Sequence, residues 1–228
     1  MRKLIKLELA KNNIRPYLLA VLGITAAMIG FTYFFAEVPN MEANETAEFG
    51  SYLDVVLIVS VLSMASFCIL SAVMFSRFVI DEYNGKRAIL LFSYPVNRRK
   101  VLAAKLTFVC AFIFIGFLVS NTVVFALFNL TEYFAPIVKE GVLSDAIRQA
   151  ALLILVEAFL AESISVIALF LGFLRKSVPV AIVTAVVLCS PVSNFGSPML
   201  MAIAMAACAV TAAVLIVVLS GRVNAMEA

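Results

Sequence analysis

Long runs of apolar residues alternate along this chain with short polar segments. A helix needs about 20 apolar residues to cross the hydrocarbon core of a bilayer, and several of the runs reach that length. They lack the ten-residue alternation that is typical of membrane β-barrels. The pattern predicts an all-α, polytopic membrane protein with six transmembrane helices in a single transmembrane domain over residues 1–228. The predicted spans are about 17–36, 52–79, 106–130, 149–174, 178–190 and 199–221.

The last two spans are separated only by a break in one long apolar stretch. Residues 177–221 carry no charge, and this stretch is too long for one helix. The break runs from Ser190 to Pro198 and holds prolines and a glycine, which are typical of a turn. Two interpretations stay open here, a tight turn and a segment that dips back into the outer leaflet.

The composition supports a membrane protein and argues against an enzyme. The chain is 64% hydrophobic and 14% charged, whereas soluble domains carry about 25% charged residues. Histidine is absent, which removes the most common general base and the most common metal ligand. The four cysteines are scattered singly through apolar runs and form no CxxC pair. We therefore expect no catalytic residues and no metal site in this chain.

The distribution of Lys and Arg predicts the orientation. Of the 17 basic residues, 15 lie in 1–15, in 77–105, at 175–176 and at Arg222, and the other two are Lys139 and Arg148. The positive-inside rule then places both termini and the central segment in the cytoplasm. We expect short interfacial helices at residues 1–15 and in the loop between spans 2 and 3. A simple positive-inside anchor is the alternative for residues 1–15.

Two acids, Glu157 and Glu162, lie inside the fourth predicted span. A charge at such a position costs about 2.5 to 3.5 kcal/mol and normally faces a cavity or a partner. One interpretation is a polar lining of a translocation path or a cation site, to which Asn121 would contribute. In the other, the helix begins later, so Glu157 lies near the outer interface, and Glu162 bonds to a residue such as Asn121 or Thr122.

The longest charged segment, residues 80–105, connects spans 2 and 3. Asp81 and Glu82 suit the start of a short helix, Gly85 allows a turn and Pro95 ends the following apolar stretch. Several basic residues then lead into span 3. This pattern indicates a charged elbow that lies along the membrane surface. The elbow is either an inert anchor or a docking element for a cytoplasmic partner.

The same segment resembles the corresponding loop of ABC-2 type transporter permeases. The matching residues are Glu82-Tyr-Asn-Gly85, Leu90-Leu91, Tyr94-Pro95-Val-Asn-Arg98 and Lys105, and the chain departs at Lys86, where the family often has Thr. The resemblance implies six spans, an N-terminal interfacial helix, and a permease dimer bound to two separate ABC ATPase subunits. It also implies an ATPase-coupling loop that includes Asp81, Glu82, Gly85, Arg87, Pro95 and Arg98.

The sequence contains no GxxxxGK[ST] motif, so ATP and Mg²⁺ would be bound by the partner ATPase. The resemblance implies export of a hydrophobic or amphipathic compound, such as a peptide or a drug-like molecule, across a bacterial cell membrane. The second permease subunit is either a copy of this chain or a related chain, and we expect no nucleic-acid partner. Two alternatives remain, a membrane scaffold that recruits a cytoplasmic protein and an ATP-independent secondary transporter.

Overall fold

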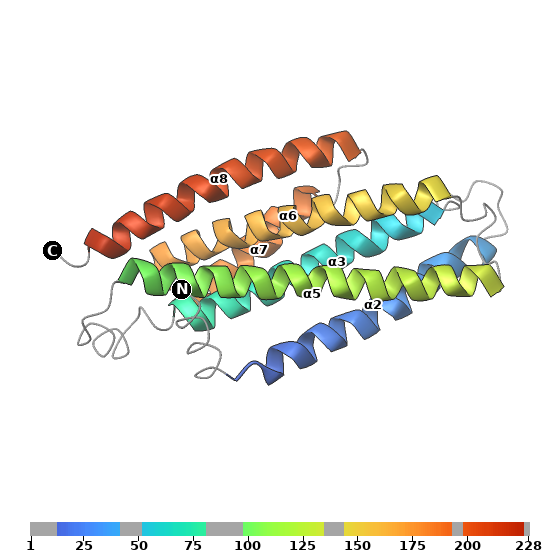
Figure 1. The fold of residues 1–228 in the computed structure, drawn as a ribbon, viewed down its shortest axis with the longest axis horizontal. Helices are drawn as coiled ribbons and strands as arrows, with labels where there is room; N and C mark the ends of the chain where they lie inside the picture. The colour runs from blue at the N-terminus through green and yellow to red at the C-terminus, as the bar shows by residue number, and fades with distance from the viewer. Residues whose placement is uncertain (1–12, 42–51, 81–97, 135–143, 193–197, 226–228) are drawn as a thin grey trace.

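The computed structural model describes residues 13–41, 52–80, 98–134, 144–192 and 198–225, and within these ranges the chain is almost entirely helical. The helices run antiparallel in chain order (Figure 1). Their bounds are α2 Arg15–Met41, α3 Tyr52–Phe75, the π-helix η1 Ser76–Ile80, α5 Arg98–Phe134, α6 Ser144–Arg175, α7 Val178–Val192 and α8 Pro198–Ala225.

Five of these helices are long and apolar enough to cross a membrane. They correspond to the predicted spans at 17–36, 52–79, 106–130, 149–174 and 199–221. The remaining element, α7, has 15 residues and is therefore about 22 Å long, shorter than a hydrocarbon core of about 30 Å. The prediction of an all-α membrane fold is confirmed, whereas the structure supports five full spans and one shorter apolar helix.

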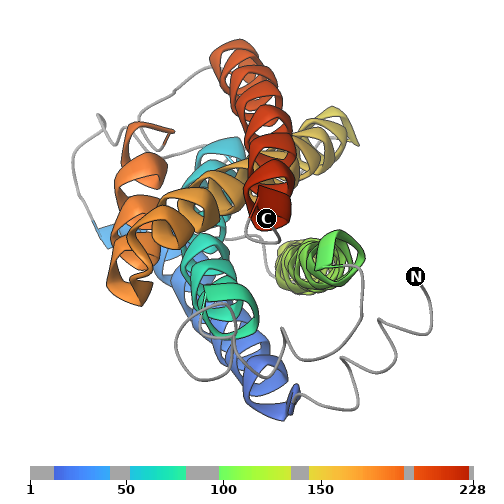
Figure 2. The same cartoon turned by 90° about the vertical axis from the view of Figure 1, so that its left-hand side faces the viewer.

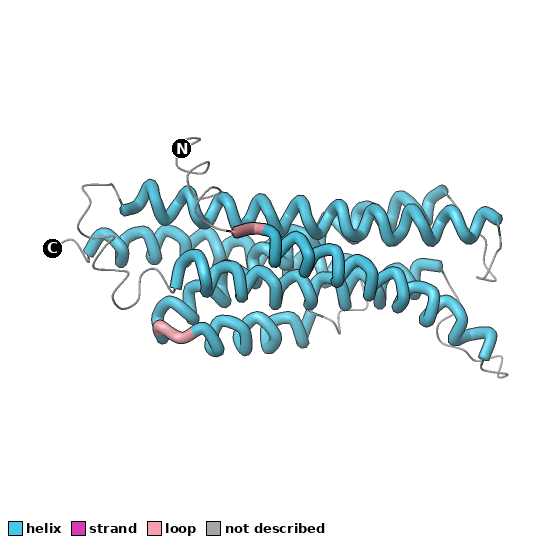
Figure 3. Tube along the Cα trace, turned by 90° about the horizontal axis from the view of Figure 1, so that it is seen from below, coloured by secondary structure: helices cyan, strands magenta, loops and turns pink. Residues whose placement is uncertain are grey.

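Different helix ends gather at the two ends of the bundle. The start of α2, the end of η1, the start of α5, the α6–α7 turn and the end of α8 lie together at one end, on the left in Figure 1. The end of α2, the start of α3, the end of α5 and the start of α6 lie at the opposite end, on the right in Figure 1, and Figure 3 shows the same elongated bundle from below. This arrangement puts the end of η1 and the start of α5, which flank segment 81–97, at the same end of the bundle as the start of α2 and the end of α8. The N-terminal interfacial helix falls mostly outside the described residues.

Local sequence explains where the helices begin and turn. Asn13 caps α2, because its Oδ1 accepts a hydrogen bond from the Arg15 N–H at 3.2 Å. Helix α6 ends in a tight turn in which the Ser177 N–H bonds to the Gly172 carbonyl at 3.1 Å. Lys176 lies in this turn with a φ of 49°, in the left-handed conformation that such helix ends require.

Helix α3 is the centre of the bundle. In the membrane-spanning part of α3, 67% of the residues are buried, whereas the share is 11% in α2 and in α8. Figure 2 shows α3 among the other helices. Phe67 on α3 packs edge-on against Phe117 on α5, with ring centroids 5.4 Å apart. The outer helices expose large apolar side chains such as Leu19 and Leu22. These exposed faces suit contact with lipid acyl chains or with another apolar protein surface.

Candidate functional site

The predicted ATPase-coupling loop falls largely outside the described residues. Asp81, Glu82, Gly85, Arg87 and Pro95 all lie in the range 81–97, which the structure does not describe. Arg98 is the first residue of α5, but its side chain is also outside the description. Their proposed contact with an ATPase therefore stays a prediction.

The structure does revise the end of that segment. Residues 98–105, which the sequence pattern assigns to the loop, form the first two turns of α5. Arg and Lys are good helix formers, so a basic stretch can extend a membrane helix beyond its apolar part. The elbow between η1 and α5 is accordingly shorter than predicted.

Glu157 is deeply buried, contrary to the interpretation that places it near the outer interface. It is the fourteenth of 32 residues in α6, because this helix begins at Ser144 and not later than predicted. Only 1% of its surface is exposed. The Ser60 hydroxyl on α3 donates a hydrogen bond of 2.9 Å to Glu157 Oε1. Its other oxygen, Oε2, has no hydrogen-bond partner among the described residues.

Asn121 forms a second buried polar contact with α3. Its side-chain amide donates to the Ser63 hydroxyl and to the Phe117 carbonyl, both at 3.0 Å, while its Oδ1 has no partner in the described part of the chain. Ser60 and Ser63 are three residues apart and therefore share one face of α3. Glu157 and Asn121 thus contact α3 at neighbouring positions from two different helices.

The polar contacts continue to α2. The hydroxyls of Thr25 on α2 and Ser120 on α5 are 2.8 Å apart, and Ser120 directly precedes Asn121. We call the set Thr25, Ser120, Asn121, Ser63, Ser60 and Glu157 the polar belt. It links four helices through side chains inside an otherwise apolar bundle. A bundle held by such bonds has a defined helix register, since a shift of one helix breaks them.

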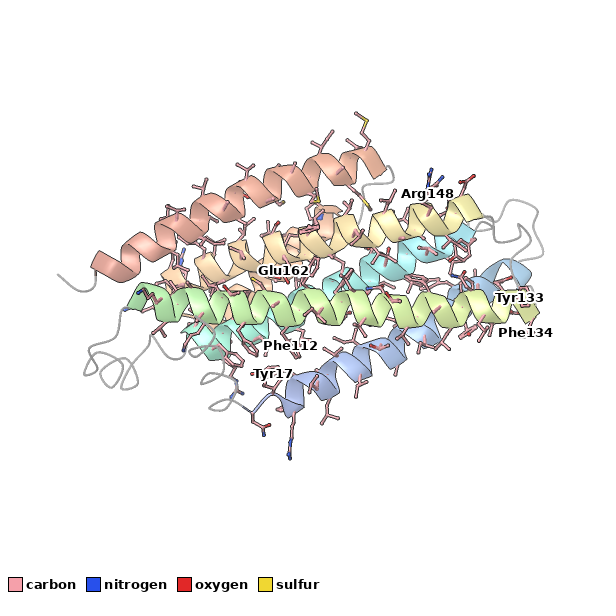
Figure 4. The ribbon with its side chains drawn as sticks, in the orientation of Figure 1. Tyr17, Phe112, Tyr133, Phe134, Arg148 and Glu162 are labelled. Atoms are coloured by element: carbon pink, nitrogen blue, oxygen red, sulfur yellow. The ribbon has the colours of Figure 1, made fainter. Side chains whose placement is uncertain are left out.

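Glu162 does not make the contacts that the second interpretation assigns to it. Asn121 bonds to Ser63, and the Thr122 hydroxyl donates to the Leu118 carbonyl of its own helix at 2.7 Å. The Cys110 thiol of α5 lies beside the Glu162 carboxyl group, but outside hydrogen-bonding geometry, so both Glu162 oxygens lack a partner among the described residues. Figure 4 labels Glu162 where α6 passes α5.

An apolar cavity of about 250 Å³ lies between α3, α6 and α8. Its walls include Val56 of α3, Val156 of α6 and Met201 of α8, and Gln149 supplies polar atoms. Val156 directly precedes Glu157, and Val56 is one helical turn before Ser60. The cavity is therefore about one turn away from the Ser60–Glu157 pair, on the side facing away from η1.

Sequence reasoning missed several buried polar side chains, among them Ser60, Ser63 and Lys105. Ser60 and Ser63 lie in an uncharged apolar run, and only their spacing on one helical face could have indicated an interhelical role. Lys105 matched the family pattern but was assigned to a loop, whereas its side chain is fully buried in the bundle. The fold also brings the thiols of Cys68 on α3 and Cys189 on α7 side by side.

Comparisons with known proteins agree with this architecture. A family model described as "ABC-2 family transporter protein" matches residues 4–192. A protein of Bacillus subtilis strain 168 named "Uncharacterized protein YcbO" is 30% identical over 191 residues, which cover 84% of this chain and 83% of that protein. No solved structure matches the chain.

Proposed function

The chain belongs to the ABC-2 family of transporter proteins and is a membrane subunit of an ABC transporter, and on this basis we propose that it is the permease of an exporter for hydrophobic or amphipathic compounds. A separate ABC ATPase supplies the energy, in two copies, and binds at segment 81–97. A second permease subunit, a copy of this chain or a related chain, completes the complex in a bacterial cell membrane.

The observation that supports an amphipathic cargo is the pairing of an apolar cavity with nearby buried acceptors. The cavity walls are apolar, while Glu157 Oε2 and Asn121 Oδ1 are acceptors without donors in the described bundle. Unpaired buried acceptors are costly, so such groups often mark a place where a ligand or water binds. A compound with an apolar body and a hydrogen-bond donor or cationic group suits this combination.

The helices that flank segment 81–97 support its proposed role in coupling. On one side of it, η1 is the continuation of α3, which carries Ser60 and Ser63 of the polar belt. On the other side, α5 carries Ser120 and Asn121 of the same belt. A movement at this end of the bundle is therefore connected through two rigid helices to the polar belt. This connection is what an ATP-driven permease requires.

The test is purification of the tagged chain from its native membrane in mild detergent, with identification of every co-purifying protein. We expect an ATPase with a P-loop in stoichiometric amount, and we expect the Glu82→Arg variant to lose it while still inserting. Glu227→Arg is the matched control, because it makes the same charge change on the same predicted side of the membrane, outside segment 81–97.

The ATPase rate of the purified complex then separates a transporter from a scaffold. A transported compound should change the hydrolysis rate of the ATPase, whereas a scaffold that only recruits the ATPase should leave it insensitive to any compound. Recovery of the chain alone across several detergents would instead favour a secondary transporter and contradict the proposal.

A further inference from the structure

Lys105 is a positively charged side chain with 0% of its surface exposed. It lies on α5, two turns after the helix begins at Arg98. Its Nζ donates a hydrogen bond of 3.0 Å to the backbone carbonyl of Phe78 in η1. A buried charge is retained only where it is well paired, so this contact calls for an explanation.

The acceptor explains why a cation is suited to this place. Phe78 is within the last turn of η1, and the last carbonyl groups of a helix are in general left without an N–H partner from that helix. The end of a helix also carries a partial negative charge, which a nearby cation stabilises. Lys105 therefore caps η1 from a different helix and satisfies a carbonyl that is buried among apolar side chains.

The π-helix η1 is also packed on its other sides. The Phe78 ring lies 5.7 Å from the Tyr17 ring of α2 and 5.8 Å from the Phe108 ring of α5. Ile80 Cδ1 reaches α6, where it would be 2.9 Å from a Cβ atom added at Gly172. Contacts from three helices thus fix the position of η1, and π-helical turns occur frequently at functional sites.

From these contacts we propose that Lys105 and η1 form a rigid joint between the end of α3 and the start of α5. Lys105 is the positioning residue of this joint, because its bond to Phe78 holds the two helices that segment 81–97 connects. A displacement of that segment then moves α3 and α5 together and does not merely bend their ends. This role in coupling rests on the proposed function, whereas the joint itself is a property of the chain alone.

The joint can be measured on the permease without any partner. Spin labels are attached at two exposed positions, Arg77→Cys on η1 and Lys100→Cys on α5, after the native cysteines are replaced. Dipolar EPR of the purified chain in lipid nanodiscs then gives the distribution of distances between the labels. We expect a narrow distribution with Lys105, its loss in Lys105→Met, and a narrow distribution in Lys105→Arg, which retains charge and donors.

Two further variants keep this measurement interpretable. Lys105→Gln retains a donor without the charge, and it replaces Lys105→Met if the latter does not elute as a single species on size exclusion. Arg175→Met removes an exposed cation at the same end of the bundle and should leave the distribution narrow. A distribution that is equally narrow in Lys105→Met and Lys105→Gln as in the parent chain would overturn the proposal.

The role in coupling is measured on the complex with its ATPase. A label at Val218, an exposed residue of α8, is combined with the one at Lys100, and spectra are recorded without nucleotide and after trapping with ATP and vanadate. We expect the Lys100–Val218 distance to change on trapping while the Arg77–Lys100 distance stays constant, and we expect Lys105→Met to lose the first change. An Arg77–Lys100 distance that changes equally would contradict a rigid joint.

The two measurements separate this inference from the proposed function. If no ATPase binds the chain, the role of Lys105 in coupling falls together with the proposed function, but the EPR result on the permease alone still decides whether the joint exists. If an ATPase binds and Lys105→Met leaves the nucleotide response intact, the proposed function stands and the role of Lys105 in coupling is refuted.

Discussion

Gly172 lies where α6 and α7 approach closely, and its substitution gives a sharp test of the packing. A Cβ atom at this position would lie 2.6 Å from the Cβ of Ala181, 3.2 Å from the Ala181 Cα and 2.9 Å from Ile80 Cδ1. The Ile80 methyl group can rotate away. Ala181 has no side-chain torsion that could relieve the contact, so Gly172→Ala must push the two helices apart.

The expected magnitude follows from two opposing effects. Overpacking in a well-packed core costs about 1 to 3 kcal/mol. Replacing glycine by alanine within a helix contributes about 0.5 to 1 kcal/mol in the opposite direction. We expect a net loss of up to about 2.5 kcal/mol in the free energy of unfolding, and a loss of about 1 to 3 kcal/mol relative to a glycine-to-alanine control without the contact. For a chain of this length, each kcal/mol of that loss lowers the melting temperature by about 2 to 4 °C.

The assay is the fraction of monodisperse protein that remains on size exclusion after heating to a series of temperatures in one detergent. Gly23→Ala and Gly30→Ala are the matched controls, because an added Cβ at either position in α2 meets no atom within 4 Å. They gain the same helix propensity without the steric contact, so we expect their melting temperatures to be unchanged or slightly raised.

The double variant Gly172→Ala/Ala181→Gly provides a second check. It removes the 2.6 Å contact, so its destabilisation should be smaller than the sum of the two single effects. A Gly172→Ala protein that melts at or above the Gly23→Ala control would refute the reasoning, because α6 and α7 would then not approach as closely as the structure shows.

Two predictions concern the buried acids. Ser60→Ala removes the donor to Glu157 Oε1 and should lower the free energy of unfolding by about 0.6 to 1.7 kcal/mol, the range of interhelical hydrogen bonds in membranes. In a Glu157→Ala protein this bond is already absent, so adding Ser60→Ala should cause no further loss. Thermal denaturation of the single and double variants measures this coupling, and fully additive effects would contradict it. Glu162→Gln should insert and fold normally but reduce substrate-stimulated ATP hydrolysis, with Glu37→Gln on exposed α2 surface as its control; an unchanged rate would exclude Glu162 from transport.

The sequence was sufficient to identify the class of the protein, because membrane insertion depends on local composition. Long apolar runs and a low fraction of charged residues are properties of the chain itself, and each run must be helical to satisfy its own backbone. The loop pattern around Glu82 and Pro95 indicated the family, which the comparisons then confirmed. Element ends were less certain, as the start of α5 at Arg98 shows.

The partners of the buried polar side chains depended on the tertiary structure. Glu157 was recognisable as an unusual residue in a span, but its bond to Ser60 joins positions 97 residues apart. One of the two interpretations bonded Glu162 to a residue such as Asn121 or Thr122, whereas the helix rotations place it beside Cys110. Which side of a uniformly apolar helix faces its neighbours leaves little trace in the sequence, because lipid and protein interior are similarly apolar.

Lys105 is the clearest example of a residue whose type is read from the sequence but whose surroundings only the tertiary structure decides. The sequence determined that a cation occurs close to the start of the third span, and a surface position was the natural assumption. Only the packing of α5 against η1 decides that this cation is buried and caps the Phe78 carbonyl. The physical reason is that a charge is tolerated inside a bundle when a helix end provides the opposite partial charge. Which helix end lies beside a given side chain depends on how the helices pack, and the sequence pattern does not reveal this.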